Sequence, residues 1–476
     1  MFSAYAGAET EENVVRQRFG KYISHLISGE YDLAGTLWLP EFTYQVYKFG
    51  ISYPGSPVKF DCNSPLILRI DDYRNGIISV SFDIVSRAIG EYVIILKIND
   101  GSNEELYKYT MIRGEDDRFY LVPRYWPIMG TMKTLGGKYY KLYYFKDWQI
   151  NDSAVAAVDY KIGEIAARLG IGQDARDRLA ADKIIYILCE NAIQVRELTG
   201  ISDQGYSDPT SNFIISSYLP HSAALTDFLI TYKLRECPLF TLPFMEKGLQ
   251  VFLGGRAGAR LSVFGQLVDF SLESDFLKLE DILVASEFSD KTGGPDFAYA
   301  LSAYFMGYLL DRLGMDDLLS LYLRFSGDDH FIDTCSLEMV KEHLKKGTGM
   351  KWNKLEKKFL SYFDTVKEYG IYPCDDKPDG EVVYQSGTAG FSVTVYEKDK
   401  EYIVDARAFE DSSFIYAALL FERKSSQYKA GYQSSLFKKH FPSRDYSNQF
   451  YGIIFNRDEA GTYNSVSYTH LTLPTN

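Results

Sequence analysis

Apolar residues in the first 135 positions change from helical spacing to the alternation of β-strands. Within residues 14–27 they recur every three or four positions, which predicts an amphipathic helix, and a shorter helix is expected over Tyr31–Trp38. Strand-like runs follow, some of them separated by Asn-Gly or Asp-Gly turns. These runs are Pro57–Asp61, Leu66–Ile70, Gly76–Arg87, Tyr92–Ile98, Leu106–Ile112 and Arg118–Pro123. The pattern predicts an α+β domain over residues 10–135.

Helices followed by a curved antiparallel meander resemble the cone of nuclear-transport-factor-like domains. The likeness concerns the fold alone, because cones of this kind either hold a ligand or mediate contacts with other proteins. His25, on the first predicted helix, is interpreted as a core or surface residue rather than a catalytic one. The N-terminal domain is therefore expected to be cone-like, with no assigned ligand.

Residues 138–368 are expected to form a second domain, with a β-rich lobe followed by a helical lobe. Lys138–Phe145 and Lys183–Cys189 have the pattern of strands, and a helix from Asn151 to Leu169 lies between them. Later apolar and amphipathic segments predict the helices of the second lobe. These are Phe297–Leu313, Met315–Phe325, Leu337–Lys346 and Trp352–Tyr362.

The centre of this domain, residues 205–254, has the pattern strand, helix, loop, helix. Thr210–Ser216 is rich in β-forming residues, and Pro220 stands where a helix would begin. Apolar residues recur at helical spacing after this proline. A second helix is predicted over Leu242–Phe252, and the glycines at 254 and 255 end it.

Within this stretch, the sequences H-S-A-A-L and M-E-K-G-L resemble the two motifs of the gluzincin zinc metallopeptidases, in particular the peptidase-MA-like family. In that family an H-E-x-x-H helix supplies two zinc ligands and a general base, and a second helix about twenty residues further on supplies a glutamate ligand. The resemblance places His221 and Glu246 at two metal-ligand positions. Ser222 stands where the general base would be, and Leu225 replaces the second histidine.

The resemblance implies a metallopeptidase fold that lacks some of the residues that zinc catalysis requires. Catalytic zinc usually has three protein ligands, and only two positions remain. Loss of a general base costs about 10²–10⁴ in rate. We therefore expect no catalytic residue, no cofactor, and a catalytically inactive protein that binds or scaffolds peptides or proteins. The cleft between its two lobes would hold an extended peptide by backbone pairing to a strand edge.

Two alternatives remain open at this point. One is a zinc metallopeptidase with noncanonical ligands, for which Asp227 is the nearest acid, although it lies about two-thirds of a turn out of phase with His221. The other alternative assumes no relationship to this family. In it, His221 caps or flanks a helix, and Glu246 is a surface acid. Metal content distinguishes the first alternative from the inactive scaffold.

Composition narrows the possible partners. The 476 residues include 51 basic and 64 acidic side chains, and the resulting net charge of −13 argues against a nucleic-acid or anionic-membrane surface. No apolar run approaches the roughly 20 residues that cross a bilayer. The five cysteines are scattered without a C-x-x-C pair, so they predict neither a disulfide framework nor a structural zinc site.

The two ends of the chain carry further expectations. Alternating runs within residues 380–465 predict a small C-terminal β-sandwich-like domain. Residues 466–476, VSYTHLTLPTN, resemble a translated sequencing adaptor and are expected to lie outside the fold, which would leave this domain truncated. Residues 4–8 contain cleavage-like small residues without a preceding apolar stretch. The protein is then either secreted or periplasmic with its signal peptide missing, or cytoplasmic.

Overall fold

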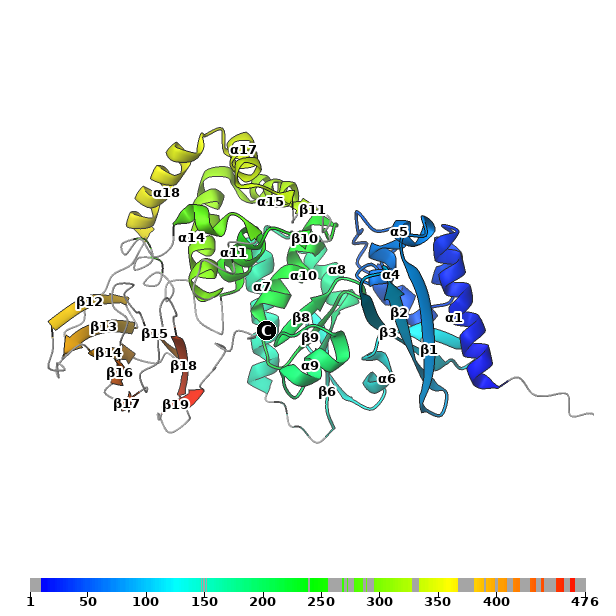
Figure 1. Cartoon of the computed structure of the whole chain (residues 1–476). Helices are drawn as coiled ribbons and strands as arrows, with labels where there is room; N and C mark the ends of the chain where they lie inside the picture. Colours follow the sequence, from blue (N-terminus) through cyan, green and yellow to red (C-terminus); the bar gives the residue numbers. More distant parts are fainter. Residues whose placement is uncertain are drawn as a thin grey trace, which may run out of the picture. The chain divides into compact units, whose positions relative to one another are not determined.

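The computed structural model describes residues 10–366 with gaps, and beyond residue 366 only the strands between 381 and 466. The gaps are residues 147, 149, 151, 239, 256–267, 269–271, 273–277, 286–287, 289–294 and 328–333. The chain divides into two compact units, Met1–Leu239 and Phe240–Asn476 (Figure 1). Helices and sheets occur in both units, which confirms the prediction of a mixed α and β protein in its coarse form.

The N-terminal layer of the first unit combines helices with an antiparallel sheet of order β1-β2-β3-β4 (Figure 1). Its helices are α1 (Glu11–Ile27), α2 (Tyr31–Gly35), α3 (Pro40–Tyr47), α4 (Pro65–Leu68), α5 (Ile70–Arg74) and α6 (Trp126–Met129). Its strands are β1 (Ser79–Ala88), β2 (Glu91–Asn99), β3 (Glu104–Arg113) and β4 (Phe119–Val122). Alternate residues of β2 are buried, because one face of the sheet packs on a core that includes Phe19 and Tyr22 of α1.

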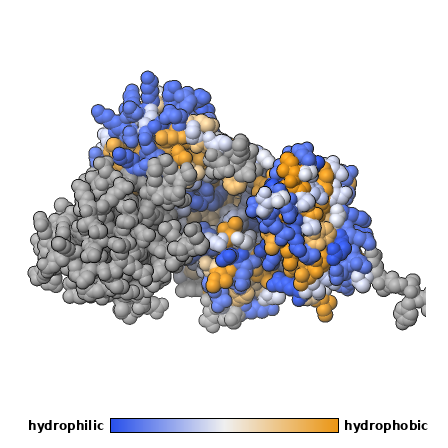
Figure 2. All heavy atoms as spheres, in the orientation of Figure 1, coloured by the Kyte–Doolittle hydropathy of each residue, from blue (hydrophilic) through white to orange (hydrophobic). Residues whose placement is uncertain are grey.

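The other face of this sheet is partly apolar and exposed. Val85 of β1 and Leu106 of β3 are exposed, as are Ile77 and Ile89 beside the strands. Figure 2 shows apolar side chains gathered over the β1–β2 part of the layer. Charged pairs interrupt this surface, among them the ion pair between Lys97 and Asp83 at 2.6 Å. Such charges are a common protection of exposed sheets against pairing with other chains.

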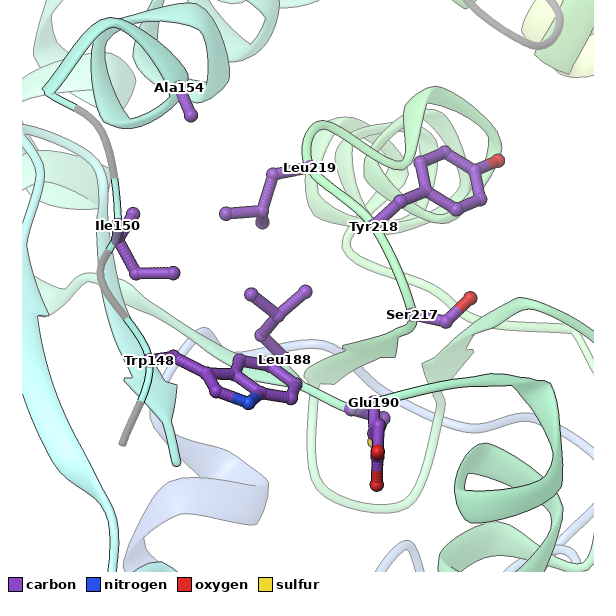
Figure 3. A pocket seen from close by; sticks show the side chains of 9 residues that line it. Trp148, Ile150, Ala154, Leu188, Glu190, Ser217, Tyr218 and Leu219 are labelled. Atoms are coloured by element: carbon purple, nitrogen blue, oxygen red, sulfur yellow. The ribbon is translucent and has the colours of Figure 1, made fainter. Parts of the chain in front are cut away.

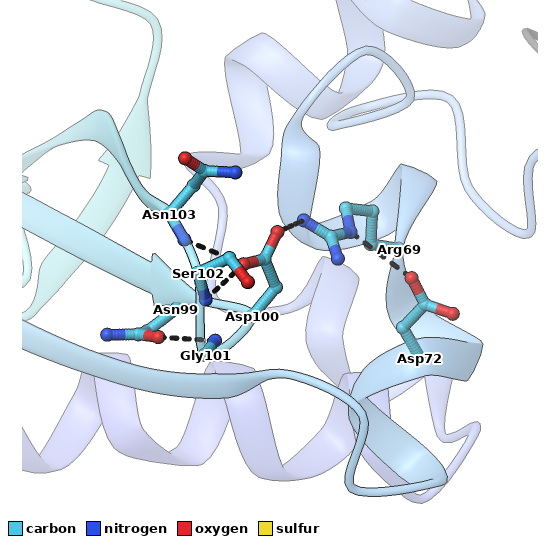
Figure 4. Close-up of polar contacts among 7 residues, drawn as sticks. All are labelled: Arg69, Asp72, Asn99, Asp100, Gly101, Ser102 and Asn103. Atoms are coloured by element: carbon cyan, nitrogen blue, oxygen red, sulfur yellow. Dashed lines mark hydrogen bonds and ion pairs between the residues drawn. The ribbon is translucent and has the colours of Figure 1, made fainter.

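The predicted turn between β2 and β3 is present at Asn99, Asp100 and Gly101. The Asn99 side chain accepts the Gly101 N–H at 2.7 Å, and Asp100 Oδ1 accepts the N–H groups of Ser102 and Asn103 (Figure 4). Gly101 has a φ of +89°, which favours glycine. These backbone hydrogen bonds lower the pKa of Asp100, and Arg69 extends from Asp72 toward the same carboxylate (Figure 4).

Two predicted strands are absent from this layer. The run Leu66–Ile70 contains α4 and the start of α5, and Pro57–Asp61 forms no strand. Ser64 caps α4 by accepting the Ile67 N–H at 3.2 Å, and Pro65 occupies the first helical position. Serine caps followed by proline favour a helix start. A short apolar run cannot be assigned to strand or helix by periodicity alone, and the cap decides it here.

The second layer of this unit is a mixed sheet of order β5-β6-β7-β9-β8. Strands β6, β7 and β9 run parallel to one another, and the edge strands β5 and β8 run antiparallel to their neighbours. The strands are β5 (Lys133–Gly136), β6 (Tyr140–Tyr144), β7 (Ile184–Leu188), β8 (Gly205–Asp208) and β9 (Phe213–Ser216). The helices are α7 (Asp152–Arg168), α8 (Gln173–Asp182), α9 (Ala192–Thr199) and α10 (Ser222–Leu234).

The strand predicted over Thr210–Ser216 is shorter than expected. Only Phe213–Ser216 pairs as β9, because the preceding residues form the turn from β8, with Asn212 at a φ of +61°. Strand β8 itself was not predicted. Its four residues, GYSD, lack the run of β-branched side chains that identifies a strand from sequence.

Buried polar contacts join the two layers of the first unit. The Lys59 ammonium donates to the Asn212 side chain and to the Val46 carbonyl, and the Asn212 amide also donates to Val46. Phe49 packs edge-on against Phe228 of α10, with ring centroids 5.1 Å apart. The predicted division between residues 135 and 138 therefore falls inside a single compact unit.

The second unit is helical before it becomes β-rich. Its helical part contains β10 (Phe240–Thr241), α11 (Pro243–Gly254), η1 (Leu279–Ile282), α14 (Pro295–Leu313), α15 (Met315–Arg324), β11 (Ser326–Gly327), α17 (Leu337–Thr348) and α18 (Trp352–Val366). Helix α11 packs closely on α14 at Gly248, where a Cβ would lie 2.9 Å from the Ser302 carbonyl oxygen. The long helices predicted from sequence are confirmed here, each to within a few residues.

Beyond residue 366, strands form one sheet of order β12-β13-β14-β16-β17 and another of order β15-β18-β19. These strands are β12 (Glu381–Thr388), β13 (Phe391–Lys398), β14 (Glu401–Ala408), β15 (Phe414–Leu419), β16 (Lys429–Gln433), β17 (Lys438–His440), β18 (Tyr451–Arg457) and β19 (Tyr463–Val466). The presence of these strands confirms the prediction that the C-terminal segment is β-rich. The tail expected to lie outside the fold, apart from Val466, is outside the described residues.

Candidate functional site

His221 is the N-cap of α10. Its Nδ1 accepts a hydrogen bond from the Ala224 N–H at 3.1 Å, so the imidazole takes the role that serine or aspartate usually plays at a helix start. The His221 backbone N–H donates to the Tyr186 hydroxyl at 3.0 Å. Tyr186 lies on β7, and its hydroxyl donates in turn to the Tyr218 carbonyl. The first position of the H-S-A-A-L motif thus begins the helix and does not lie within it.

The His221 ring is enclosed by its neighbours and is only 5 % exposed. It lies directly against Gly205 of β8, where a Cβ would overlap with the ring atoms. The Tyr218 ring lies 4.8 Å away, between centroids. Glycine at position 205 is therefore required by this close approach and not by a special backbone angle.

The hydrogen bond at Nδ1 determines the tautomer of His221. A neutral imidazole has one protonated nitrogen and one acceptor nitrogen. Because Nδ1 accepts the Ala224 N–H, the proton is on Nε2. A protonated nitrogen has no lone pair for a metal ion. In this arrangement neither nitrogen is available as a zinc ligand, and metal binding would require the helix cap to open.

The other two positions of the motif are embedded in α10. Ser222 is the first helical residue, and its carbonyl oxygen accepts the Thr226 hydroxyl at 2.8 Å. Leu225 is completely buried. Asp227, the acid considered for a substitute zinc site, is half-buried on the same helix. The helix face at 225, where a second histidine would stand, packs into the core.

Glu246 lies in the first turn of α11, in the second unit. Its Oε1 accepts hydrogen bonds from Lys247 at 2.6 Å and from Gln250 at 2.9 Å. A carboxylate in the first turn is also favoured by the helix dipole. These contacts give Glu246 a local structural role. The expectation that Glu246 and His221 face each other from two helices, as the resemblance implies, stays a prediction.

The outer edge of β8 presents backbone groups for a further strand. Antiparallel neighbours alternate between hydrogen-bonded and non-hydrogen-bonded pairs. The Ser217 N–H donates to the Gln204 carbonyl at 2.8 Å, so the next pair, Gly205 with Ser216, is non-hydrogen-bonded. The N–H and C=O groups of Gly205 and Ser207 consequently point away from β9, although Gly205 is buried and only Ser207 is partly exposed. Among the described residues these groups have no hydrogen-bond partner.

A pocket lies at the carboxyl ends of the parallel strands, with a volume of about 330 Å³. Ile150, Leu188 and Leu219 turn toward one space beside Trp148 (Figure 3). Crevices at this end of parallel strands are frequent ligand sites. Cys189 also lines the pocket, but burial raises the pKa of its thiol to about 12, which makes it a poor nucleophile.

No protein-family model, curated protein or solved structure matches this chain. Within the described residues, no group of three or more His, Cys, Asp or Glu side chains is placed to hold a metal ion. None of the described helices is both long and apolar enough to cross a membrane.

Proposed function

We propose that this chain is a catalytically inactive, metallopeptidase-like protein that binds an extended peptide along the outer edge of β8. The observation that carries this proposal is Ser207, a half-buried residue whose N–H and C=O groups point away from β9 without a partner in the described part of the chain. A peptide strand that pairs with an open sheet edge obtains its affinity from such groups.

The His221 environment supports a role without zinc chemistry. The Nδ1 cap leaves the imidazole with a proton on Nε2, and Leu225 fills the helix face that would carry a second histidine. Ser222 has no carboxylate to accept the proton of a metal-bound water. A peptide at this edge would therefore be held and released intact.

Peptide binding at the outer edge of β8 is tested by removing the backbone N–H of Ser207. Ser207→Pro deletes the outward N–H of Ser207 and leaves the β8–β9 hydrogen bonds intact, whereas Ser207→Ala keeps the N–H and serves as the control. The probes are short random-sequence peptides selected on phage against the full chain, measured by fluorescence polarisation. We expect Ser207→Pro to weaken binding about fivefold or more, and Ser207→Ala to change it little. Equal binding by both variants and the wild type would show that this edge is not used.

Absence of zinc chemistry is tested separately. After incubation with zinc and removal of the excess, we expect substoichiometric metal by inductively coupled plasma mass spectrometry. We also expect no cleavage of casein. Stoichiometric zinc together with cleavage that 1,10-phenanthroline abolishes would instead support the alternative, a zinc metallopeptidase with noncanonical ligands.

A further inference from the structure

A narrow cleft between the two layers of the first unit combines buried acids with unused hydrogen-bond donors. We call it the tyrosine cleft. It encloses about 70 Å³. Its lining includes Trp38, Asp61, Tyr107, Arg124, Tyr206 and Asp208. A space of this size holds a ligand of only a few heavy atoms.

The two aspartates of the tyrosine cleft already have donors. Asp61 Oδ2 accepts the hydroxyls of Tyr22 and Tyr109 at 2.6 and 2.8 Å. Asp208 Oδ2 accepts the Tyr125 hydroxyl at 2.5 Å, and further bonds come from the residues of the following turn. Burial raises the pKa of both carboxyl groups, that of Asp61 to about 7. Neither acid needs a bound cation to satisfy it.

The hydrogen-bond donors that line the tyrosine cleft, in contrast to its two aspartates, have few partners among the described residues. Among the described residues, the Tyr107 hydroxyl forms no hydrogen bond. The Tyr206 oxygen accepts the Asn63 amide at 3.1 Å, and its own proton has no acceptor in the part of the chain that the structure describes. The Arg124 guanidinium makes only two long contacts, both of 3.4 Å, to the Lys108 carbonyl, and in the described part of the chain it has no carboxylate partner. Burial lowers the pKa of Arg124, because desolvation disfavours the charged guanidinium.

We propose that the tyrosine cleft binds the carboxylate of a small monoanionic ligand, held by the Arg124 guanidinium and the Tyr107 and Tyr206 hydroxyls. Guanidinium groups pair preferentially with planar carboxylates and phosphates. Above the pKa of about 7 that burial gives Asp61, the charged carboxylates of Asp61 and Asp208 line the same space and repel a dianion such as phosphate more strongly than a monoanion. The site uses the side chain of Tyr206 and not the β8 backbone, so it goes beyond the proposed peptide edge and does not depend on it.

The experiment is calorimetric titration of the full chain with sodium acetate, at an ionic strength held constant with sodium chloride, and in parallel with inorganic phosphate. Arg124→Gln removes the charge, and Tyr107→Phe removes one hydroxyl and keeps the ring. Lys133→Gln is the control, since Lys133 is an exposed lysine on β5, away from the cleft lining.

We expect saturable binding of one acetate per chain. Arg124→Gln should weaken it about tenfold or more and Tyr107→Phe about threefold or more, because hydrogen bonds to a charged group are strong. Lys133→Gln should bind as the wild type does. Tyr107→Phe decides the case if Arg124→Gln does not fold. The proposal is overturned by an absence of saturable acetate binding, by unchanged affinity in the foldable variants, or by tighter binding of phosphate than of acetate.

Discussion

Burial changes the chemistry of individual side chains in this protein, most clearly at Asp61. The carboxyl group is 3 % exposed and is surrounded by the hydroxyls of Tyr22 on α1 and Tyr109 on β3. Desolvation raises its pKa to about 7, and the two tyrosine hydrogen bonds counteract only part of this increase. Lys59 experiences the corresponding effect for a cation, because burial lowers its pKa to about 8.

The raised pKa of Asp61 predicts that stability falls as pH rises. Between the unfolded pKa of about 4 and the folded value of about 7, the folded chain holds a proton that the unfolded chain has released. The stabilisation is therefore complete below pH 4 and is lost as pH rises through 7. The loss is on the order of 2–4 kcal/mol. Asp61→Asn should reduce this slope in urea unfolding between pH 5 and 7.

Asp71→Asn is the control for this experiment, because the Asp71 side chain is 81 % exposed. It should keep the slope of the wild type. Asp208, whose pKa burial also raises, is expected to leave a residual slope in Asp61→Asn. An unchanged slope in Asp61→Asn would contradict the assignment of this pH dependence to Asp61.

At the scale of elements, the start of α10 depends on contacts from two strands. His221 supplies the cap, Tyr186 of β7 binds the His221 backbone N–H, and Gly205 of β8 leaves room for the ring. The helix beyond this point is stabilised by burial of Leu225 and Phe228 in the core. The position that the resemblance assigns to a metal ligand is thus built into the helix terminus.

The cap predicts a specific pattern of stability in His221 variants. His221→Ala removes the acceptor for the Ala224 N–H, and we expect a loss of about 1–2 kcal/mol in the free energy of unfolding. His221→Asn retains a good cap residue and should lose clearly less. Chemical denaturation with and without zinc measures both effects. Equal losses in the two variants, or a stabilisation of the wild type alone by zinc, would argue against a cap role.

At the scale of the whole molecule, the first unit contains buried cores of its own. One core joins α1 to the sheet β1–β4, and another, which includes Tyr125 and Phe213, lies on the second sheet. Lys59 and Asn212 connect the two layers through a buried hydrogen bond. A unit with its own buried core is expected to fold independently.

We therefore predict that a fragment of residues 10–238 folds alone. Far-UV circular dichroism and tryptophan fluorescence should report one cooperative urea transition with the same midpoint. Residues 10–135 on their own should fold less stably, because the buried contacts of Lys59 and Phe49 with the second layer are lost. A 10–238 fragment that unfolds without cooperativity would contradict the independence of this unit.

Much of the secondary structure follows from local pattern. The helices α1, α7 and α18 and the strands β1–β3 were predicted from alternating or helically spaced apolar residues, and α14, β4 and β7 from nearly continuous apolar runs. Helix α8, in contrast, was missed because its sequence QDARDRLAAD buries little beyond Leu179. The run at Leu66–Ile70 was assigned to the wrong class because a short apolar segment fits both periods.

The sequence by itself determined the amphipathic helices, the buried strand β7 and the β2–β3 turn, since these depend on neighbouring residues. Only the tertiary structure determined the hydrogen-bond partners and the burial of the polar residues. Asp61 meets Tyr22 and Tyr109 across 39 and 48 positions, and His221 meets Gly205 because β8 lies beside α10. Desolvation and tautomer both depend on these distant neighbours, and for that reason no local motif could specify the chemistry of the site.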